Sequence, residues 1–160
     1  MRIYLDNCCF NRPFDDQSSL TIRLETEAKL DIQEKIKSGI FALGWSYILD
    51  HENSANPSVE RWMEIQAWKS IADSFVSETP EILANMHTLT GIGLKPLDSL
   101  HIACAVSLEY EYFLTVELYA KVASHPLTTL KTSSKYSFIP YKLRFLVSFR
   151  LVMKHDPTFA

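Results

Sequence analysis

The sequence predicts an α/β fold in which helices cover a parallel sheet. Short apolar runs typical of strands alternate with longer amphipathic stretches typical of helices, and the loops between them are short. At 160 residues and 47% apolar, the chain is long enough for one domain with a proper core, and no Pro/Gly/Ser-rich linker interrupts it. Ligands of parallel sheets bind beyond the carboxyl ends of the strands, so the residues that follow each strand carry the functional prediction.

The first half of the chain is expected to hold two strands and two helices. In order, we expect a strand at 3–5, a polar turn at 11–19, a helix at 20–36, a strand at 40–45 and a short helix at 47–54. Apolar residues at near-helical spacing, with charges between them, predict the first helix, and Gly39 ends it. Ser46 is expected to cap the short helix, which ends before Pro57 because the residue before a proline leaves the helical region.

The second half continues the alternation. We expect a helix at 59–72, a strand at 74–76, a helix that opens at Thr79-Pro80 and closes near Gly91, a helix at 95–106 and a strand at 112–115. The spacing of Trp62, Ile65 and Trp68 puts them on one side of the helix at 59–72. The segment 95–106 is dense in small and apolar residues, which predicts a helix buried nearly all round.

Acidic residues occupy the positions where a parallel sheet binds ligands. Asp6 directly follows the first strand, Glu52 lies on the helix after the second strand, Asp98 opens the buried helix, and Glu117 follows the last strand. Carboxylates that converge at one sheet edge repel each other, and a hard divalent cation such as Mg²⁺ or Mn²⁺ relieves that repulsion. Two structural alternatives stay open: Asp98 could cap its helix, and Glu52 could lie on a solvated helix face.

Three segments carry a family resemblance: IYLDNCCFNRPFDDQ, LGWSYILDHENSANP and KPLDSLHIACAVSLEYEYFLT. In this order they resemble the PIN domains, a family of metal-dependent ribonucleases, and most of all a prokaryotic branch close to the toxins of toxin–antitoxin pairs. The resemblance covers about residues 1–117. It implies a PIN-like three-layer α/β/α fold with a central parallel sheet, and it implies that Asp6, Glu52 and Asp98 bind Mg²⁺ or Mn²⁺ and carry catalysis.

The resemblance also implies partners and further site residues. RNA is the expected substrate, and a cognate antitoxin protein and a second copy of the chain are expected partners. Asn7, Arg12 and Thr115 are candidate RNA-contacting residues. Relatives usually carry an Asp where this chain has Glu117, so Glu117 completes the catalytic and metal-binding set only if its longer side chain can replace that Asp. We expect a PIN-like domain over 1–123 and a basic segment, atypical of the family, over 124–160.

Charge and cysteine content indicate the cellular compartment and the kind of partner to expect. Residues 1–120 carry a net charge of −9 and residues 121–160 one of +6, which gives the overall −3, and the basic end either meets phosphates or is a solvated tail. Cys8, Cys9 and Cys104 form no CxxC pair, which argues against a zinc site and fits a reducing cytosol. The first apolar run is too short for a signal peptide and no stretch is apolar enough for a membrane span, so we expect a cytoplasmic protein.

These observations leave a leading hypothesis and two alternatives. The leading one is a Mg²⁺/Mn²⁺-dependent endoribonuclease, as a solitary nuclease or as the toxin of a pair. The second is a catalytically degenerate PIN domain that binds RNA or protein, motivated by Glu117 and the unfamiliar tail. A haloacid-type phosphatase is disfavoured because Cys8 stands where that class places a second Asp, and a phospho-receiver because its acidic pair and lysine are not evident. His101, one turn after Asp98, could approach the site, but we expect an interior histidine with satisfied hydrogen bonds.

Overall fold

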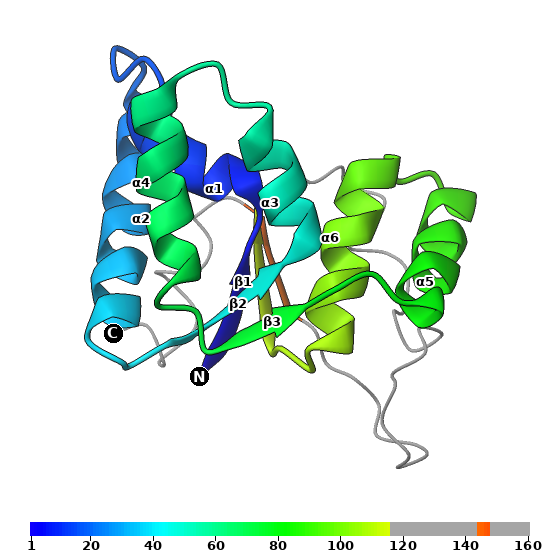
Figure 1. Ribbon diagram of the computed structural model, residues 1–160. Coiled ribbons are helices and arrows are strands. Elements are labelled where there is room, and N and C mark those ends of the chain that lie inside the picture. Colours follow the sequence, from blue (N-terminus) through cyan, green and yellow to red (C-terminus); the bar gives the residue numbers. More distant parts are fainter. Residues whose placement is uncertain (116–143, 148–160) are drawn as a thin grey trace.

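The computed structural model describes residues 1–115 and 144–147 (Figure 1). Within them, five parallel strands form one sheet in the order β3-β2-β1-β4-β5. These strands are β1 (Arg2–Leu5), β2 (Ala42–Ser46), β3 (Ser74–Val76), β4 (Tyr112–Thr115) and β5 (Arg144–Val147). β1 is therefore the central strand. It pairs with β2 on one side and with β4 on the other.

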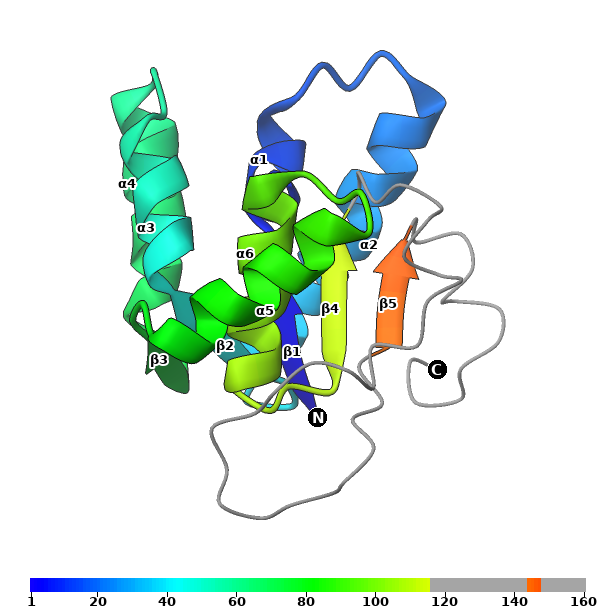
Figure 2. The same ribbon diagram turned by 90° about the vertical axis from the view of Figure 1, so that its right-hand side faces the viewer.

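Helices cover both faces of this sheet. They are α1 (Asn7–Asn11), the 3₁₀ turn η1 (Arg12–Phe14), α2 (Leu20–Lys37), α3 (Tyr47–Ser54), α4 (Val59–Lys69), α5 (Pro80–Gly91) and α6 (Pro96–Ser107). Helices α2 and α4 lie to one side of the sheet, and α5 and α6 lie to the other, packed against each other (Figures 1 and 2). The predicted three-layer α/β/α architecture with a central parallel sheet is confirmed.

Local sequence rules account for most helix boundaries. The Thr79 hydroxyl accepts a hydrogen bond from the Ile82 backbone N–H, and Pro80 takes the first helical position of α5. The Ser58 hydroxyl caps α4 in the same way. Gly39 follows α2 with a φ of +77°, a left-handed conformation that glycine adopts without steric cost and that ends the helix.

Aromatic packing joins the layers on one face of the sheet. Phe10 of α1 contacts the indole of Trp45 on β2, with ring centroids 5.4 Å apart, and that of Trp68 on α4, at 6.1 Å. On the other face, α6 buries a continuous run from His101 to Val106 against the sheet. The prediction of a helix buried over most of its surface is therefore confirmed for α6.

Five expectations need correction. Ser46 stands at the N-cap position of α3, but its side chain makes no capping hydrogen bond. Residues 7–11, where no element was predicted, form α1. The second strand begins at Ala42, two residues later than predicted, and Ile40 before it is exposed. Helix α4 ends at Lys69 rather than at residue 72 because the Ser70 N–H turns back to the Ala67 carbonyl. Trp62, placed by its spacing on the same side of that helix as Ile65, is 39% exposed, whereas Ile65 is 1% exposed.

The predicted boundary between 1–123 and 124–160 lies outside the described residues. One described part of the second segment, β5, pairs in parallel register with β4, so these four residues extend the sheet of the predicted PIN-like domain. In the part of the chain that the structure describes, no helix is long and apolar enough to cross a membrane.

Candidate metal centre

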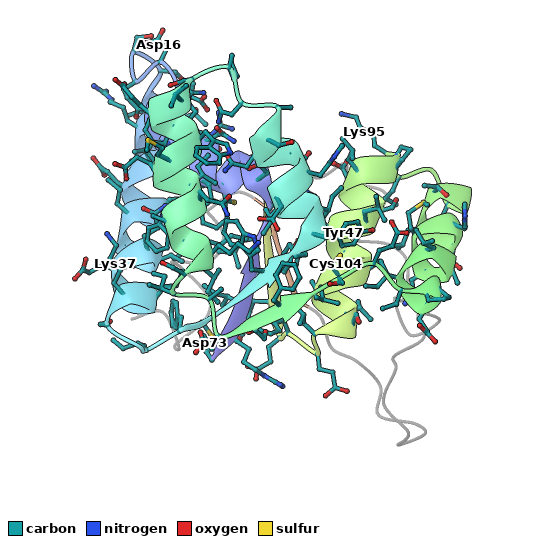
Figure 3. The ribbon with its side chains drawn as sticks, in the orientation of Figure 1. Asp16, Lys37, Tyr47, Asp73, Lys95 and Cys104 are labelled. Atoms are coloured by element: carbon teal, nitrogen blue, oxygen red, sulfur yellow. The ribbon has the colours of Figure 1, made fainter. Side chains whose placement is uncertain are left out.

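The carboxyl edge of the sheet gathers side chains from four separate segments. Asp6 follows β1, Glu52 lies on α3 after β2, and Thr115 ends β4. Helix α6 begins at the same edge, as the position of Lys95 just before it shows, whereas Asp73, before β3, marks the opposite edge (Figure 3). Parallel pairing of β1 with β2 and β4 makes this convergence unavoidable, because strands that run in one direction end together.

Asp6 is held rigidly in this position. Its backbone N–H donates to the Leu114 carbonyl at 2.9 Å, which continues the pairing of β1 with β4 beyond the strand. One carboxylate oxygen, Oδ2, accepts hydrogen bonds from the Thr115 hydroxyl at 2.7 Å and the Cys8 thiol at 3.3 Å. Asp6 is only 8% exposed, so the charge of its carboxylate lies in a largely desolvated place and is stabilised by these donors.

His101 lies between the two acids. It projects from α6 with 1% of its surface exposed, and its Nε2 is 2.7 Å from Glu52 Oε2 and 3.5 Å from Asp6 Oδ1. One ligand-type atom from each of Asp6, Glu52 and His101 lies within 4.8 Å of the other two. Two carboxylates and one imidazole at this spacing are a donor set that fits a divalent cation.

Behind His101 runs a buried chain of hydroxyl groups. The Tyr4 hydroxyl lies 2.9 Å from His101 Nδ1 and 2.6 Å from Ser46 Oγ. When Nδ1 lacks a proton it accepts from Tyr4, which in turn accepts from Ser46; when Nδ1 carries a proton, both donations reverse. Burial raises the pKa of Tyr4 well above its ordinary value, so the phenol keeps the proton that this chain needs. The chain fixes the imidazole plane in either state.

Electrostatics favour a protonated imidazole when only protein groups face it. Burial lowers the pKa of His101, but the hydrogen bond to Glu52 and the negative charges of Asp6, Glu52 and Asp98 outweigh burial and raise it above its ordinary value. An imidazolium at this point offsets the repulsion between the two carboxylates. The centre is thus built to hold positive charge between Asp6 and Glu52.

The remaining predicted site residues differ in where they lie. Asp98 is half-buried in the first turn of α6, where the helix dipole favours a carboxylate, and its charge acts on His101, but it is not a member of the three-residue donor set. Glu117 lies outside the described residues. Asn7 opens α1 beside Asp6, and its buried Oδ1 has no hydrogen-bond partner among the described residues.

Arg12, a candidate RNA contact, is engaged within the protein. Its guanidinium forms ion pairs at 3.0 Å with Asp15 through one nitrogen and with Glu25 of α2 through another, and its side chain is 17% exposed. Thr115, another candidate RNA contact, donates a hydrogen bond from its hydroxyl to the Asp6 carboxylate. Both side chains therefore have structural roles in addition to any contact with RNA.

The functional residues that sequence reasoning missed are those that support the acids. His101 is an interior histidine with satisfied hydrogen bonds, as expected, but its partners are the site acids themselves. Its spacing three residues after Asp98 was the available signal, because residues three apart share a helix face. The sequence contained no signal for Tyr4, Ser46 and Cys8. A tyrosine in a strand or a serine before a helix is common whether or not the residue supports a functional site.

Comparison with known proteins supports the fold but does not assign a family. No protein-family sequence profile matches the chain, and no curated protein sequence matches it. Among solved structures, the chain superposes on one chain of VapBC2 from Rickettsia felis. That crystal structure contains VapBC2 bound to a DNA fragment from the VapBC2 promoter. The match covers 82% of this chain and 98% of that one, with a TM-score of 0.51 and 12% sequence identity. At this identity the similarity establishes a shared PIN-like α/β fold and nothing about chemistry.

Proposed function

We propose that this protein is an endoribonuclease of PIN-domain type that hydrolyses RNA phosphodiester bonds and depends on Mg²⁺ or Mn²⁺. The observation that carries the proposal is the convergence of Asp6, Glu52 and His101 within 4.8 Å at the carboxyl edge of a parallel sheet. A PIN-like fold shared with a chain of VapBC2 and the three sequence segments that resemble PIN domains support it.

The acids would hold the cation. Asp6 and Glu52 supply carboxylate oxygens at the centre, and the family resemblance adds Asp98 and Glu117 as further ligands. When bound, a divalent cation supplies Lewis-acid chemistry, offsetting charge at a phosphoryl oxygen and favouring deprotonation of water near neutral pH. The chain's own contribution is orientation: Thr115 and Cys8 fix the Asp6 carboxylate, and His101 fixes that of Glu52.

Substrate contact is proposed for three residues near this centre. Asn7 has a buried amide oxygen without a partner among the described residues, and Thr115 sits beside Asp6. Arg12 contacts an RNA phosphate if its guanidinium exchanges Asp15 or Glu25 for that anion, since the geometry of a guanidinium matches both phosphate and carboxylate.

The biological setting is proposed from the same resemblance. The protein acts in the cytoplasm as the toxin of a toxin–antitoxin pair, a cognate antitoxin protein covers the acidic edge, and two copies associate as a homodimer. The shared fold with a chain of VapBC2, which was solved bound to promoter DNA, is compatible with this setting.

Replacing single acids with amides tests the proposal. Asp6→Asn and Asp98→Asn keep size and polarity but remove a charge, so both variants should fold and lose metal-dependent RNA cleavage by about 100-fold or more. Asp16→Asn, in an exposed loop, is the matched control and should cleave as the natural protein does (Figure 3). Full RNase activity in both site variants would refute the assignment.

A second candidate function is favoured by one observation. His101 already lies between the two carboxylates, hydrogen-bonded to Glu52 at 2.7 Å and 3.5 Å from Asp6, so the centre is balanced by the protein alone, as expected of a degenerate PIN domain that binds RNA or protein without cleaving. Robust metal-dependent cleavage by the natural chain excludes this candidate. An inactive natural chain that gains activity in Glu117→Asp would establish it instead.

A further inference from the structure

We propose that His101 is itself a ligand of the divalent cation, through Nε2, and that this nitrogen makes the centre prefer first-row transition ions such as Mn²⁺ over Mg²⁺. The inference rests on the proposed function and deepens it. It assigns a ligand that the resemblance to PIN domains does not include and narrows the choice between the two metals.

The position of Nε2 is the first argument. Protein ligands stand about 2.0–2.2 Å from ions of this class, so atoms that share one ion lie about 3–4 Å from each other. His101 Nε2 and Asp6 Oδ1 are 3.5 Å apart, within that range. Nε2 and Glu52 Oε2 are 2.7 Å apart, a hydrogen bond that a small rotation of the Glu52 side chain converts to ligand spacing. Asp6 Oδ2 is held by Thr115, so Oδ1 is the oxygen on the His101 side.

The support behind the ring is the second argument. A metal-binding histidine nearly always donates its other N–H to a fixed acceptor, which sets the tautomer and the ring plane. His101 has this arrangement already: Nδ1 faces the Tyr4 oxygen at 2.9 Å, and Tyr4 can pass its own proton to Ser46 at 2.6 Å. All three side chains are buried, so the orientation cannot be lost to solvent.

Donor chemistry then sets the metal preference. Mg²⁺ demands oxygen ligands in near-octahedral geometry and keeps most of its water, so an imidazole contributes little to its binding. Imidazole binds first-row transition ions better, and the affinity of a mixed nitrogen and oxygen site rises from Mn²⁺ towards Cu²⁺. A centre with one buried imidazole among its ligands therefore discriminates against Mg²⁺ in a way that an all-carboxylate centre does not.

Mn²⁺ is the probe, because its electron paramagnetic resonance reports both binding and the bound nuclei. Titration of the full 160-residue chain gives the affinity, and electron spin echo modulation detects a coordinated ¹⁴N. The natural protein should show ¹⁴N coupling. His101→Gln should lose the coupling and bind Mn²⁺ about tenfold or more weakly, whereas Mg²⁺ affinity, measured by competition, should change about threefold or less.

Two further variants separate ligand from neighbour. His51→Gln removes an exposed histidine on α3 directly beside Glu52, and it should keep both the ¹⁴N coupling and the affinity. Tyr4→Phe removes only the acceptor behind the ring; it should keep a ¹⁴N coupling with shifted frequencies and bind Mn²⁺ about tenfold more weakly. This variant also serves if His101→Gln fails to fold, because unchanged frequencies and affinity in Tyr4→Phe would contradict the ligand assignment.

Each outcome bears on a different statement. Bound Mn²⁺ without ¹⁴N coupling in the natural protein, or undiminished affinity in a folded His101→Gln, overturns the inference and leaves a metal-dependent nuclease possible, with His101 as a counter-ion only. Bound Mn²⁺ with ¹⁴N coupling but no RNA cleavage upholds the ligand and refutes the proposed function. Failure of the folded natural protein to bind Mn²⁺ at all refutes both.

Discussion

Removing the Tyr4 hydroxyl is the most direct test of the buried chain behind the centre. Tyr4→Phe deletes one oxygen that bonds both Ser46 and His101 and keeps the ring, which stacks on Phe113 with centroids 5.7 Å apart and planes at 14°. The apolar packing therefore survives and the loss is purely polar. Leaving a buried polar group without its partner costs about 1–3 kcal/mol, so the loss of the partner of both Ser46 and His101 costs about 2–6 kcal/mol.

Urea unfolding of the metal-free protein, followed by the fluorescence of its three tryptophans, of which Trp45 is fully buried, measures this free energy. Tyr110→Phe is the matched control, since that hydroxyl makes a 2.7 Å hydrogen bond to half-buried Ser74 at the opposite sheet edge. We expect the control to lose about 1 kcal/mol. The reasoning fails if Tyr4→Phe is destabilised no more than the control, because the hydroxyl would then not be integral to the core.

The remaining predictions concern a buried cation and the pH dependence of stability. Lys29, 2% exposed, donates to the Cys8 carbonyl at 2.9 Å and so ties α2 to α1; Lys29→Met should lower the free energy of unfolding by about 1–3 kcal/mol. Lys37 lies at the end of the same helix, and Lys37→Met removes its cation–π contact with Trp68 of α4. This variant should lower the free energy of unfolding by about 1 kcal/mol or less, and an equal loss in the two lysine variants would contradict the role of burial. Because the folded pKa of His101 is raised, its stabilisation of the metal-free protein should be complete below the unfolded pKa of about 6.5 and decline as pH rises through the folded pKa. The difference in unfolding free energy between the natural protein and His101→Gln should therefore narrow as pH rises above about 6.5, and a widening difference would show that the sign is wrong.

The sequence predicted the architecture well because the architecture follows from local rules. Apolar runs located every strand from β1 to β4, and the Thr79-Pro80 signal located the start of α5. What it missed was too short or depended on tertiary contacts. Helix α1 has five residues, fewer than the periodicity of a helix needs to become visible.

Ser46 and His101 show why the site was harder to predict than the fold. Ser46 stands at the N-cap position of α3, as predicted, but its side chain does not cap the helix, because Tyr4 on the neighbouring strand engages it instead. His101 bonds Glu52, 49 positions earlier in the sequence. The partners of a buried polar group are set by strand order and helix placement, which a local pattern does not encode.

The central place of β1 has a consequence for how the protein is made. β1 leaves the ribosome before the other strands of this sheet, yet Asp6 at its end meets Thr115, 109 positions later, and on that side β1 pairs only with β4. Contacts so distant in sequence form late and slowly in folding. A growing chain can pair β1 with β2 but cannot yet give Asp6 its hydrogen bonds to Leu114 and Thr115, so the Asp6 carboxylate takes its fixed position at the centre only after β4 has been synthesised.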